Sequence, residues 1–347
     1  MPGSLNEAGS LDEAGSANGA GTADEAAAAR YRPLLFSIAY GMTGSVGDAE
    51  DIVQDAFLGL TRARLAGTEV GNVKAYLTTA VTRLGINYLG SARVRRETYV
   101  GDWLPEPVVV PADGAPGSAL AGGTGPAGGM GPAEHAELAD SLSLAFLVLL
   151  EALSPVERAV FMLREVFGYG YQDVARITGK SEVNCRQIFG RARHRIAAVG
   201  PLSTPPPAPA GRAESEELAR RFFAAAGGGD LDALLTMLAP DVVFYGDGGG
   251  RAQALGKPLT GREPVMRFIS GLFRRGAYLG ASLRAAWVNG QPGVVSYDAG
   301  ERVINVLALD IAGGQVRAIR SVVNPDKLGH LGPVSDVALL RRREEPG

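Results

Sequence analysis

The sequence predicts a multidomain fold in which two all-α domains precede an α+β domain. Helical periodicity dominates residues 34–84 and 154–197, where apolar side chains recur every three or four positions. The last third of the chain differs, because helices give way to short strand-like runs between 281 and 323. Stretches rich in Gly, Ala and Pro separate the three parts, as expected of linkers.

The composition restricts the classes of protein to consider. The 347 residues carry a net charge of −3, so strong unaided binding to DNA is not expected. No apolar run approaches the roughly 20 residues that a bilayer requires, and the start lacks a secretion signal. A single cysteine, Cys185, and three histidines exclude an internal disulfide and disfavour a zinc site. We therefore expect a cytoplasmic protein without membrane segments, metal or cofactor.

The first folded part follows an acidic tail of small residues at 1–25. Two amphipathic helices are predicted on either side of a turn at 44–47, and Asp48 is expected to cap the second. The outer face of that second helix is acidic, which by itself predicts only a solvated surface. It carries Glu50, Asp51, Gln54 and Asp55.

A third helix is expected to start near Asn72 and to be apolar on one side through Leu84. Positive charge follows phosphates and aromatic faces stack on unpaired bases, so its basic and aromatic residues form a candidate DNA site. Because Gly85 and Gly90 weaken the helix, a loop before Asn87 or at 90–91 is the expected pocket for a flipped base. The candidate DNA-binding residues are Lys74, Tyr76, Arg83, Asn87, Tyr88, Arg93, Arg95 and Arg96.

Residues 101–133 are predicted to form a connector. Trp103, Leu104 and Pro105 are its apolar start, where two prolines stiffen the chain. A flexible segment of Gly, Ala and Pro follows. Taken alone, the apolar start predicts a local hydrophobic contact. Helical periodicity then returns from Glu134 to Leu153.

The run from 154 to 197 predicts a helix-turn-helix. It opens with a capping box, Ser154 to Glu157, with proline at the first helical position. A second helix fits 171–178, and Ser181 can cap a third helix that is apolar inside and basic outside. Such a helix fits a DNA major groove, although a helical bundle with a solvated basic face is the alternative. The DNA-facing candidates are Lys180, Ser181, Asn184, Arg186, Gln187, Arg191 and Arg193.

These stretches resemble a known family. GYGYQDVARITGKSEVNCRQIFGRARHRI resembles region 4 of an extracytoplasmic-function (ECF) sigma-70 factor, which reads the upstream promoter element. GSVGDAEDIVQDAF resembles the region 2 helix that docks on the clamp coiled coil of RNA polymerase. The resemblance implies that Asp48, Asp51, Gln54 and Asp55 contact polymerase. It also implies that the basic stretch reads and melts the start-proximal element. SARVRRETYVGDWLPEP and SEVNCRQ are similar to the SigJ-like group, which carries a fused SnoaL-like domain.

The part after 212 is predicted to be α+β, with helices first and a curled antiparallel sheet afterwards. GDLDALLTMLAPDVVF resembles the SnoaL-like branch of the nuclear-transport-factor-two (NTF2) fold, a cone with an apolar pocket. If the cone is an enzyme, Asp247 is the candidate acid/base group, assisted by Tyr245 and Asp298. Small-molecule sensing is a second role for the cone, and a regulatory domain packed on the sigma domains is the default.

Two motifs of this domain are DGGGR at 247–251 and NPDKL at 324–328, which by composition are a loop and a turn. The resemblance implies that they, with the apolar start of the connector, are surfaces through which the C-terminal domain influences the sigma core. The interdomain candidates are Trp103, Leu104, Pro105, Asp247, Gly248, Arg251, Asn324, Pro325, Asp326, Lys327 and Leu328.

With this resemblance, the expected function is that of an alternative sigma factor rather than an enzyme. It would bind core RNA polymerase at the clamp coiled coil and the flap, recognise two promoter elements and initiate transcription, modulated by its C-terminal domain. A small-molecule ligand of that domain stays open as a partner. The alternative is a ligand-sensing helix-turn-helix regulator that acts without polymerase. The expected parts are a tail (1–25), region 2 (26–100), a connector (101–133), region 4 (134–199), a Pro-rich linker (200–212), the SnoaL-like domain (213–330) and a tail (331–347).

Overall fold

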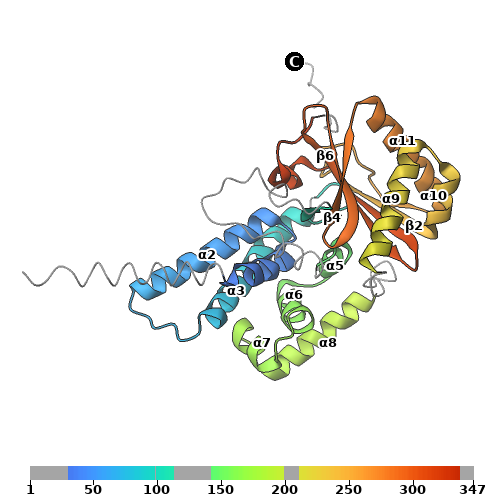
Figure 1. The fold of residues 1–347 in the computed structure, drawn as a ribbon. Helices are drawn as coiled ribbons and strands as arrows, with labels where there is room; N and C mark the ends of the chain where they lie inside the picture. The colour runs from blue at the N-terminus through green and yellow to red at the C-terminus, as the bar shows by residue number, and fades with distance from the viewer. Residues whose placement is uncertain (1–29, 98, 113–141, 199–210, 337–347) are drawn as a thin grey trace, which may run out of the picture.

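The computed structural model describes residues 30–97, 99–112, 142–198 and 211–336. The predicted tail at 1–25, the flexible segment at 113–133, the helical start at 134–141, the linker at 200–210 and the end of the chain from 337 lie outside these residues. Figure 1 shows two helical parts beside a curved sheet that carries helices on one side. Within the described part of the chain, no helix combines the length and apolar character needed to cross a bilayer.

The first helical part contains a helix over residues 30–43, α2 (Val46–Leu65) and α3 (Val73–Glu97). Ser45, not Asp48, caps α2: its side chain accepts a hydrogen bond from Asp48 N at 3.2 Å. The expected loop before Asn87 or at 90–91 is wrong, since α3 runs unbroken through both positions. Glycine at 85 permits a close helix approach, because a Cβ there would lie 3.2 Å from the Met42 side chain.

The second helical part contains α5 (Leu144–Leu150), α6 (Pro155–Phe161), a π-helical turn (Met162–Val166), α7 (Tyr171–Thr178) and α8 (Glu182–Ala198). The capping box is confirmed, because Glu157 Oε2 accepts a hydrogen bond from Ser154 N at 3.0 Å. The predicted helix-turn-helix is also confirmed: Gly179 turns the chain at φ +69°, and Ser181 Oγ accepts a hydrogen bond from Asn184 N. The helix predicted to run to Leu153 is helical only over α5 within the described residues.

The C-terminal part contains α9 (Arg212–Gly228), α10 (Leu231–Met237) and α11 (Arg262–Tyr278) against one sheet. The strands are β1 (Val109–Pro111), β2 (Leu238–Asp247), β3 (Leu259–Thr260), β4 (Ser282–Val288), β5 (Gln291–Tyr297), β6 (Val303–Ala312) and β7 (Gln315–Val322), in the order β1-β4-β5-β6-β7-β2-β3. Two 3₁₀ turns, η3 (Pro325–Lys327) and η4 (Gly329–Leu331), follow.

The sheet differs from the prediction in two ways. It is mixed rather than antiparallel, because β2 pairs with β7 in parallel. It also gains an edge strand, β1, from the predicted connector; β1 pairs antiparallel with β4. The connector is therefore built into the C-terminal sheet before the chain enters the second helical part.

The predicted tail from 331 is part of the fold as far as 336. Val334 bridges to Val303, and the buried Ser335 donates a hydrogen bond from Oγ to Asp298 Oδ2 at 2.6 Å. This bond and those from Arg302 and Gly300 lower the pKa of Asp298 to about 2. Asp298 thus secures the segment around Ser335 to the β5–β6 connection.

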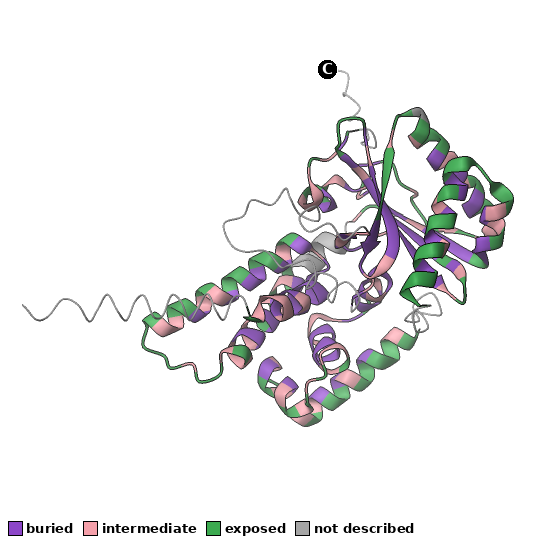
Figure 2. Ribbon diagram, in the orientation of Figure 1, coloured by how far each residue is buried: buried purple, intermediate pink, exposed green. Residues whose placement is uncertain are grey.

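Hydrophobic clusters cross the boundaries between the three parts, and Figure 2 shows buried residues where these parts meet. One cluster joins the first helical part, including Tyr40 and Leu77, to Leu147 and Leu150 of α5. A second cluster joins the opposite side of α5, at Leu144, to the strands of the sheet. Helix α5 therefore lies between the helical core and the sheet, and it buries apolar side chains against both.

Candidate functional site at the interdomain junction

The DGGGR and NPDKL motifs meet because the strands that precede them run in the same direction. β2 ends at Asp247 and β7 at Val322, and these two residues are register partners. Loops that leave parallel neighbours emerge at the same edge of the sheet. The Asp247 carbonyl oxygen then accepts hydrogen bonds from Val323 N at 2.9 Å and Asn324 N at 3.0 Å.

The Asp247 side chain is the centre of this junction and is fully buried. Its Oδ1 accepts a hydrogen bond from the Tyr99 hydroxyl. Its Oδ2 accepts from Leu104 N at 2.8 Å and from Lys327 Nζ at 2.7 Å. A buried carboxylate is tolerated when it has a charge partner and hydrogen bonds of this kind. Asp247 thereby ties the connector to the NPDKL turn.

The Lys327 ammonium is the positive partner, and its residue is only 7% exposed. It also donates a hydrogen bond to the Leu104 carbonyl oxygen. Its Nζ lies 4.7 Å from the ring centroid of Tyr99 and 4.5 Å from that of Trp103. Aromatic faces attract a desolvated cation, so the connector surrounds this ammonium with a carbonyl and two rings.

Tyr99 links the connector to both motifs. Asn324 Nδ2 donates to Tyr99 Oη at 2.8 Å. Burial, reinforced by the charge of Asp247, raises the pKa of Tyr99 far above its usual value. The phenol consequently stays protonated and can donate to the carboxylate. Gly249 faces this contact at φ +57°, and a Cβ there would lie 2.3 Å from Asn324 Nδ2.

The other predicted interdomain residues lie in the same region. Leu104 and Leu328 are buried in the cluster that contains the sheet. Arg251 and Asp326 form an ion pair, but on the exposed rim. Gly248 is close to the backbone, since a Cβ there would lie 2.4 Å from the Ala252 carbonyl oxygen. The structure therefore brings the three predicted motifs together.

The connector also contacts the first helical part. Gly44 has φ +67°, and a Cβ there would lie 2.6 Å from the Trp103 ring and 3.6 Å from Pro105. Glu106 Oε2 accepts a hydrogen bond from Val46 N at 2.7 Å, at the start of α2. That end of a helix favours negative charge, while burial raises the pKa of Glu106. The connector thus packs against the turn before α2 and accepts a hydrogen bond from the first residue of α2.

Asn289 joins the three parts and is 1% exposed. Its Nδ2 donates to Tyr40 Oη at 2.8 Å and to the Leu142 carbonyl oxygen at 2.8 Å. Its Oδ1 accepts from Val108 N at 2.9 Å. One amide on the β4–β5 turn therefore holds the first helix, the entry to the second helical part and the connector.

Two arginines join the helical parts directly. Arg158 of α6 is 3% exposed and donates from Nη1 to the Met42 carbonyl oxygen at 2.7 Å. Arg83 of α3 donates from Nε to the Ile177 carbonyl oxygen at 3.2 Å. Together with the shared core, these bonds pack the helix-turn-helix against α3.

The predicted polymerase-binding residues lie along α2. Asp51, Gln54 and Asp55 are exposed, and the exposed Leu58 continues the row one turn later. Asp48 differs, since its Oδ2 accepts a hydrogen bond from the Tyr88 hydroxyl. The exposed face therefore offers two carboxylates, an amide and an apolar side chain to a partner.

The predicted start-proximal residues do not share one exposed face. Lys74 and Asn87 are exposed on α3, and Arg83 contacts α7. Tyr76 packs against the helical core, and its hydroxyl donates to the Gly59 carbonyl oxygen at 3.2 Å. Tyr88 packs there too. Arg93, Arg95 and Arg96 belong to α3, but their side chains lie outside the described residues.

The predicted upstream-element residues lie together on α8 and the turn before it. Lys180, Ser181, Arg186, Gln187, Arg191 and Arg193 are exposed, and Asn184 is half-buried. The opposite face of α8 buries Cys185, Ile188 and Ala192. This one-sided burial is the arrangement by which a recognition helix stands on a domain and enters a major groove.

Comparisons with known families agree with this architecture. Residues 27–95 match Sigma-70 region 2, residues 143–196 match Sigma-70 region 4, and residues 219–323 match a SnoaL-like domain. Over 325 residues the chain is 39% identical to the ECF RNA polymerase sigma factor SigJ of Mycobacterium tuberculosis, which covers 91% of this chain and 94% of SigJ. The chain belongs to the ECF sigma factors.

A solved structure and a second relative of this sigma factor agree with the match. A crystal structure of the M. tuberculosis extracytoplasmic function sigma factor SigJ covers 90% of this chain and 98% of its own, with a TM-score of 0.65 and 33% identity. An M. tuberculosis protein named "Probable ECF RNA polymerase sigma factor SigI" is 31% identical over 306 residues, covering 88% of this chain and 95% of its own. The predicted family and its combination of two sigma domains with a SnoaL-like domain are confirmed.

The structure corrects the position of the candidate catalytic group in this sigma factor. The SnoaL-like domain contains a cavity lined by α11 and by β4 to β6, among other segments. Neither Asp247 nor its predicted helpers, Tyr245 and Asp298, line it. Asp247 instead holds the connector, so an acid/base role in the cavity is excluded for this residue.

Sequence reasoning missed Asn289 and Arg158 in this sigma factor. Asn289-Gly290 is a hairpin-turn dipeptide, and Asn289 has φ +49°. The turn could therefore be predicted from the sequence, whereas the distant hydrogen-bond partners of the Asn289 amide could not. Arg158 directly follows the capping box, and nothing local in the sequence indicates its burial.

Proposed function

We propose that this sigma factor binds core RNA polymerase, directs it to promoters with two elements, and is held closed by its C-terminal domain until polymerase binds. It would catalyse no reaction itself, because RNA synthesis belongs to the polymerase. Family membership supports the partner, and the exposed face of α2 supports the mode of contact. Asp51, Gln54 and Asp55 would meet the clamp coiled coil, while region 4 meets the flap, in the cytoplasm where the polymerase works.

Promoter recognition would be divided between two helices. The exposed face of α8, with Gln187 and Arg191 near its middle, would read the upstream element in the major groove. Helix α3 would bind the start-proximal element, beginning with the exposed Lys74 and Asn87. The net charge of −3 is in keeping with a factor that needs polymerase to bind DNA firmly.

The closed state is supported most directly by Asn289. Its amide bonds Tyr40 of region 2, Leu142 before region 4 and Val108 of the connector. The two sigma regions also share one hydrophobic cluster. They cannot separate along a promoter without breaking these contacts. A partner that binds the open form better will shift the equilibrium toward it, and core polymerase would be that partner.

Transcription with purified core polymerase on a pool of promoter fragments, read by sequencing the transcripts, tests the proposal. Wild-type protein should produce transcripts from defined start sites. Asn289→Asp keeps the acceptor for Val108 but removes both donated bonds, so it should open the factor and raise transcription several-fold. Gly313→Asn is the matched control, because it changes a hairpin turn with open space around it.

Each result bears on a different part of the proposal. If wild-type protein gives no transcript but binds the same fragments selectively on its own, it is a polymerase-independent regulator instead. If folded Asn289→Asp transcribes less than wild type, the C-terminal domain assists rather than restrains. Point variants are preferable to deleting the domain, because deletion would also leave β1 without its partner strand.

A further inference from the structure

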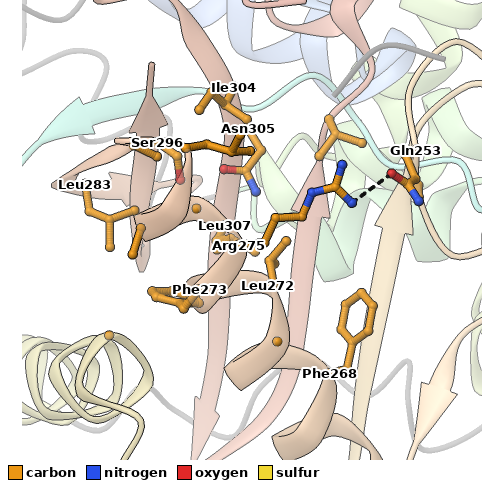
Figure 3. Close-up of a pocket in the computed structure, with 18 of the residues that line it drawn as sticks. Gln253, Phe268, Leu272, Phe273, Arg275, Leu283, Ser296, Ile304, Asn305 and Leu307 are labelled. Atoms are coloured by element: carbon orange, nitrogen blue, oxygen red, sulfur yellow. Dashed lines mark hydrogen bonds between the residues drawn. The ribbon is translucent and has the colours of Figure 1, made fainter. Parts of the chain in front are cut away.

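The C-terminal domain contains a cavity that is separate from the interdomain junction. Its volume is about 580 Å³, within the range that holds small organic molecules. Figure 3 shows its wall, which is mostly apolar and includes Phe268 and Leu272 of α11 and Leu307 of β6. The junction residues Asp247 and Lys327 do not line it. The cavity therefore needs its own explanation.

One polar residue that lines the cavity carries a buried, unsatisfied atom. Asn305 lines the cavity, is 5% exposed, and its Oδ1 has no hydrogen-bond partner within the described part of the chain. Burying an acceptor without a partner costs free energy, whereas an apolar residue at the same place would avoid that cost. An unpaired acceptor on a residue that lines an apolar cavity suits a ligand with an N–H or O–H group.

The rim of the cavity is basic and apolar. Arg275 is exposed there, and its Nη1 is 3.2 Å from Gln253 Oε1, to which it donates. Leu279 and Leu283 line the same cavity and are 41% and 43% exposed. A guanidinium at the rim favours a ligand whose outer end is negative.

We propose that this cavity binds an amphipathic organic anion. The ligand has an apolar body of about two rings, a hydrogen-bond donor for Asn305 Oδ1, and an anionic group that pairs with Arg275. Apolar packing provides most of the affinity and the two polar contacts orient the molecule, as in other small-molecule sites. This site does not depend on the proposed restraint, because it uses other residues.

The full-length protein can be tested with 8-anilinonaphthalene-1-sulfonate, a probe with two aromatic groups, an N–H donor and a sulfonate. Calorimetry should give one site per chain. Arg275→Gln should weaken this probe about threefold, the size expected of an exposed ion pair. The same variant should leave the affinity for N-phenyl-1-naphthylamine unchanged. That probe has the same rings and N–H group but no sulfonate to pair with Arg275. Arg274→Gln is the matched control, since Arg274 is exposed but does not line the cavity.

Two further variants test the interior. Asn305→Leu should weaken both probes about tenfold, which corresponds to one buried hydrogen bond, while raising the melting temperature of the free protein. Leu272→Trp should fill the cavity and abolish binding of both probes. The proposal is overturned if Arg275→Gln behaves like Arg274→Gln, or if folded Asn305→Leu binds both probes as wild type does. If Leu272→Trp does not fold, the surface variant at Arg275 still decides the outcome.

Discussion

Arg83 Nε donates a hydrogen bond to the Ile177 carbonyl oxygen over 3.2 Å, and this bond joins α3 of region 2 to α7 of region 4. The acceptor lies in the last turn of α7, where helix carbonyl groups lack partners and carry the negative end of the dipole. Arg83 is also one of the residues that the sequence predicts to bind the start-proximal DNA. The closed arrangement and a promoter phosphate would therefore compete for one guanidinium.

Replacing Arg83 with Met tests this competition in the free factor. Arg83→Met keeps the apolar stem but loses the interdomain hydrogen bond, which is worth about 1 kcal/mol. Backbone amides at the end of α7 and in the turn to α8 should exchange with solvent faster, as measured by hydrogen–deuterium exchange. Lys74→Met is the control, because Lys74 is exposed on the same helix. Equal exchange in the two variants would show that Arg83 does not hold α7.

The buried Asp247–Lys327 pair should matter far more than the exposed Arg251–Asp326 pair beside it. Asp247→Asn leaves the Lys327 ammonium buried without its carboxylate, and such losses cost about 3–5 kcal/mol. Asp326→Asn removes a partner from an ion pair whose two side chains are 61% and 57% exposed, so it should cost less than about 1 kcal/mol. Urea unfolding of both variants gives the comparison. Similar losses would mean that Asp247 does not organise the junction.

The surroundings of Asp102 predict that the stability of the protein depends on pH. Burial raises the pKa of Asp102 and the charge of Asp247 adds to this, while its Oδ2 has no hydrogen-bond partner among the described residues. The folded state therefore holds the proton more tightly than the unfolded chain does. The contribution of this proton to the free energy of unfolding is fully present below the unfolded pKa of 3.8. It is lost as the pH rises through the raised pKa of the folded state.

Asp102→Asn mimics the protonated group and separates this effect from others. The variant should melt at a higher temperature than wild type at pH 7 and show little difference near pH 4. Scanning calorimetry across this range measures both. Glu216→Gln, at an exposed position on α9, controls for the loss of one negative charge. A gain in melting temperature that is the same at both pH values would contradict the prediction.

Local signals explain why parts of the fold could be predicted. The pattern predicts a helix over 171–178, and α7 has those bounds, because glycine at both ends and apolar spacing within act over a few residues. The parallel pairing of β2 with β7 joins strands about seventy residues apart, and short-range alternation carries no information about it. Had this pair been antiparallel as expected, the DGGGR and NPDKL loops would lie at opposite ends.

The candidate site likewise has features that the local sequence indicates and features that only the fold determines. The motifs of the junction were identified by resemblance, whereas the bonds of Asp247 to Tyr99 and Leu104 depend on the three-dimensional fold. β1 escaped prediction because three residues beside a proline-rich run resemble a connector. Asn289 escaped because a turn residue gives no local sign of partners nearly 250 positions away.

Arg191 on the exposed face of α8 provides a test of promoter reading through salt dependence. If its guanidinium contacts a promoter phosphate, Arg191→Gln should weaken promoter binding by the polymerase complex across different sequences. It should also reduce the slope of log affinity against log salt by about 1, since one counterion fewer is released. Filter binding at several salt concentrations measures the slope. Arg220→Gln is the control, because Arg220 is exposed on α9 and paired with Glu217. An unchanged slope would remove Arg191 from the set of phosphate contacts, and a loss confined to particular base changes would assign it to base reading instead.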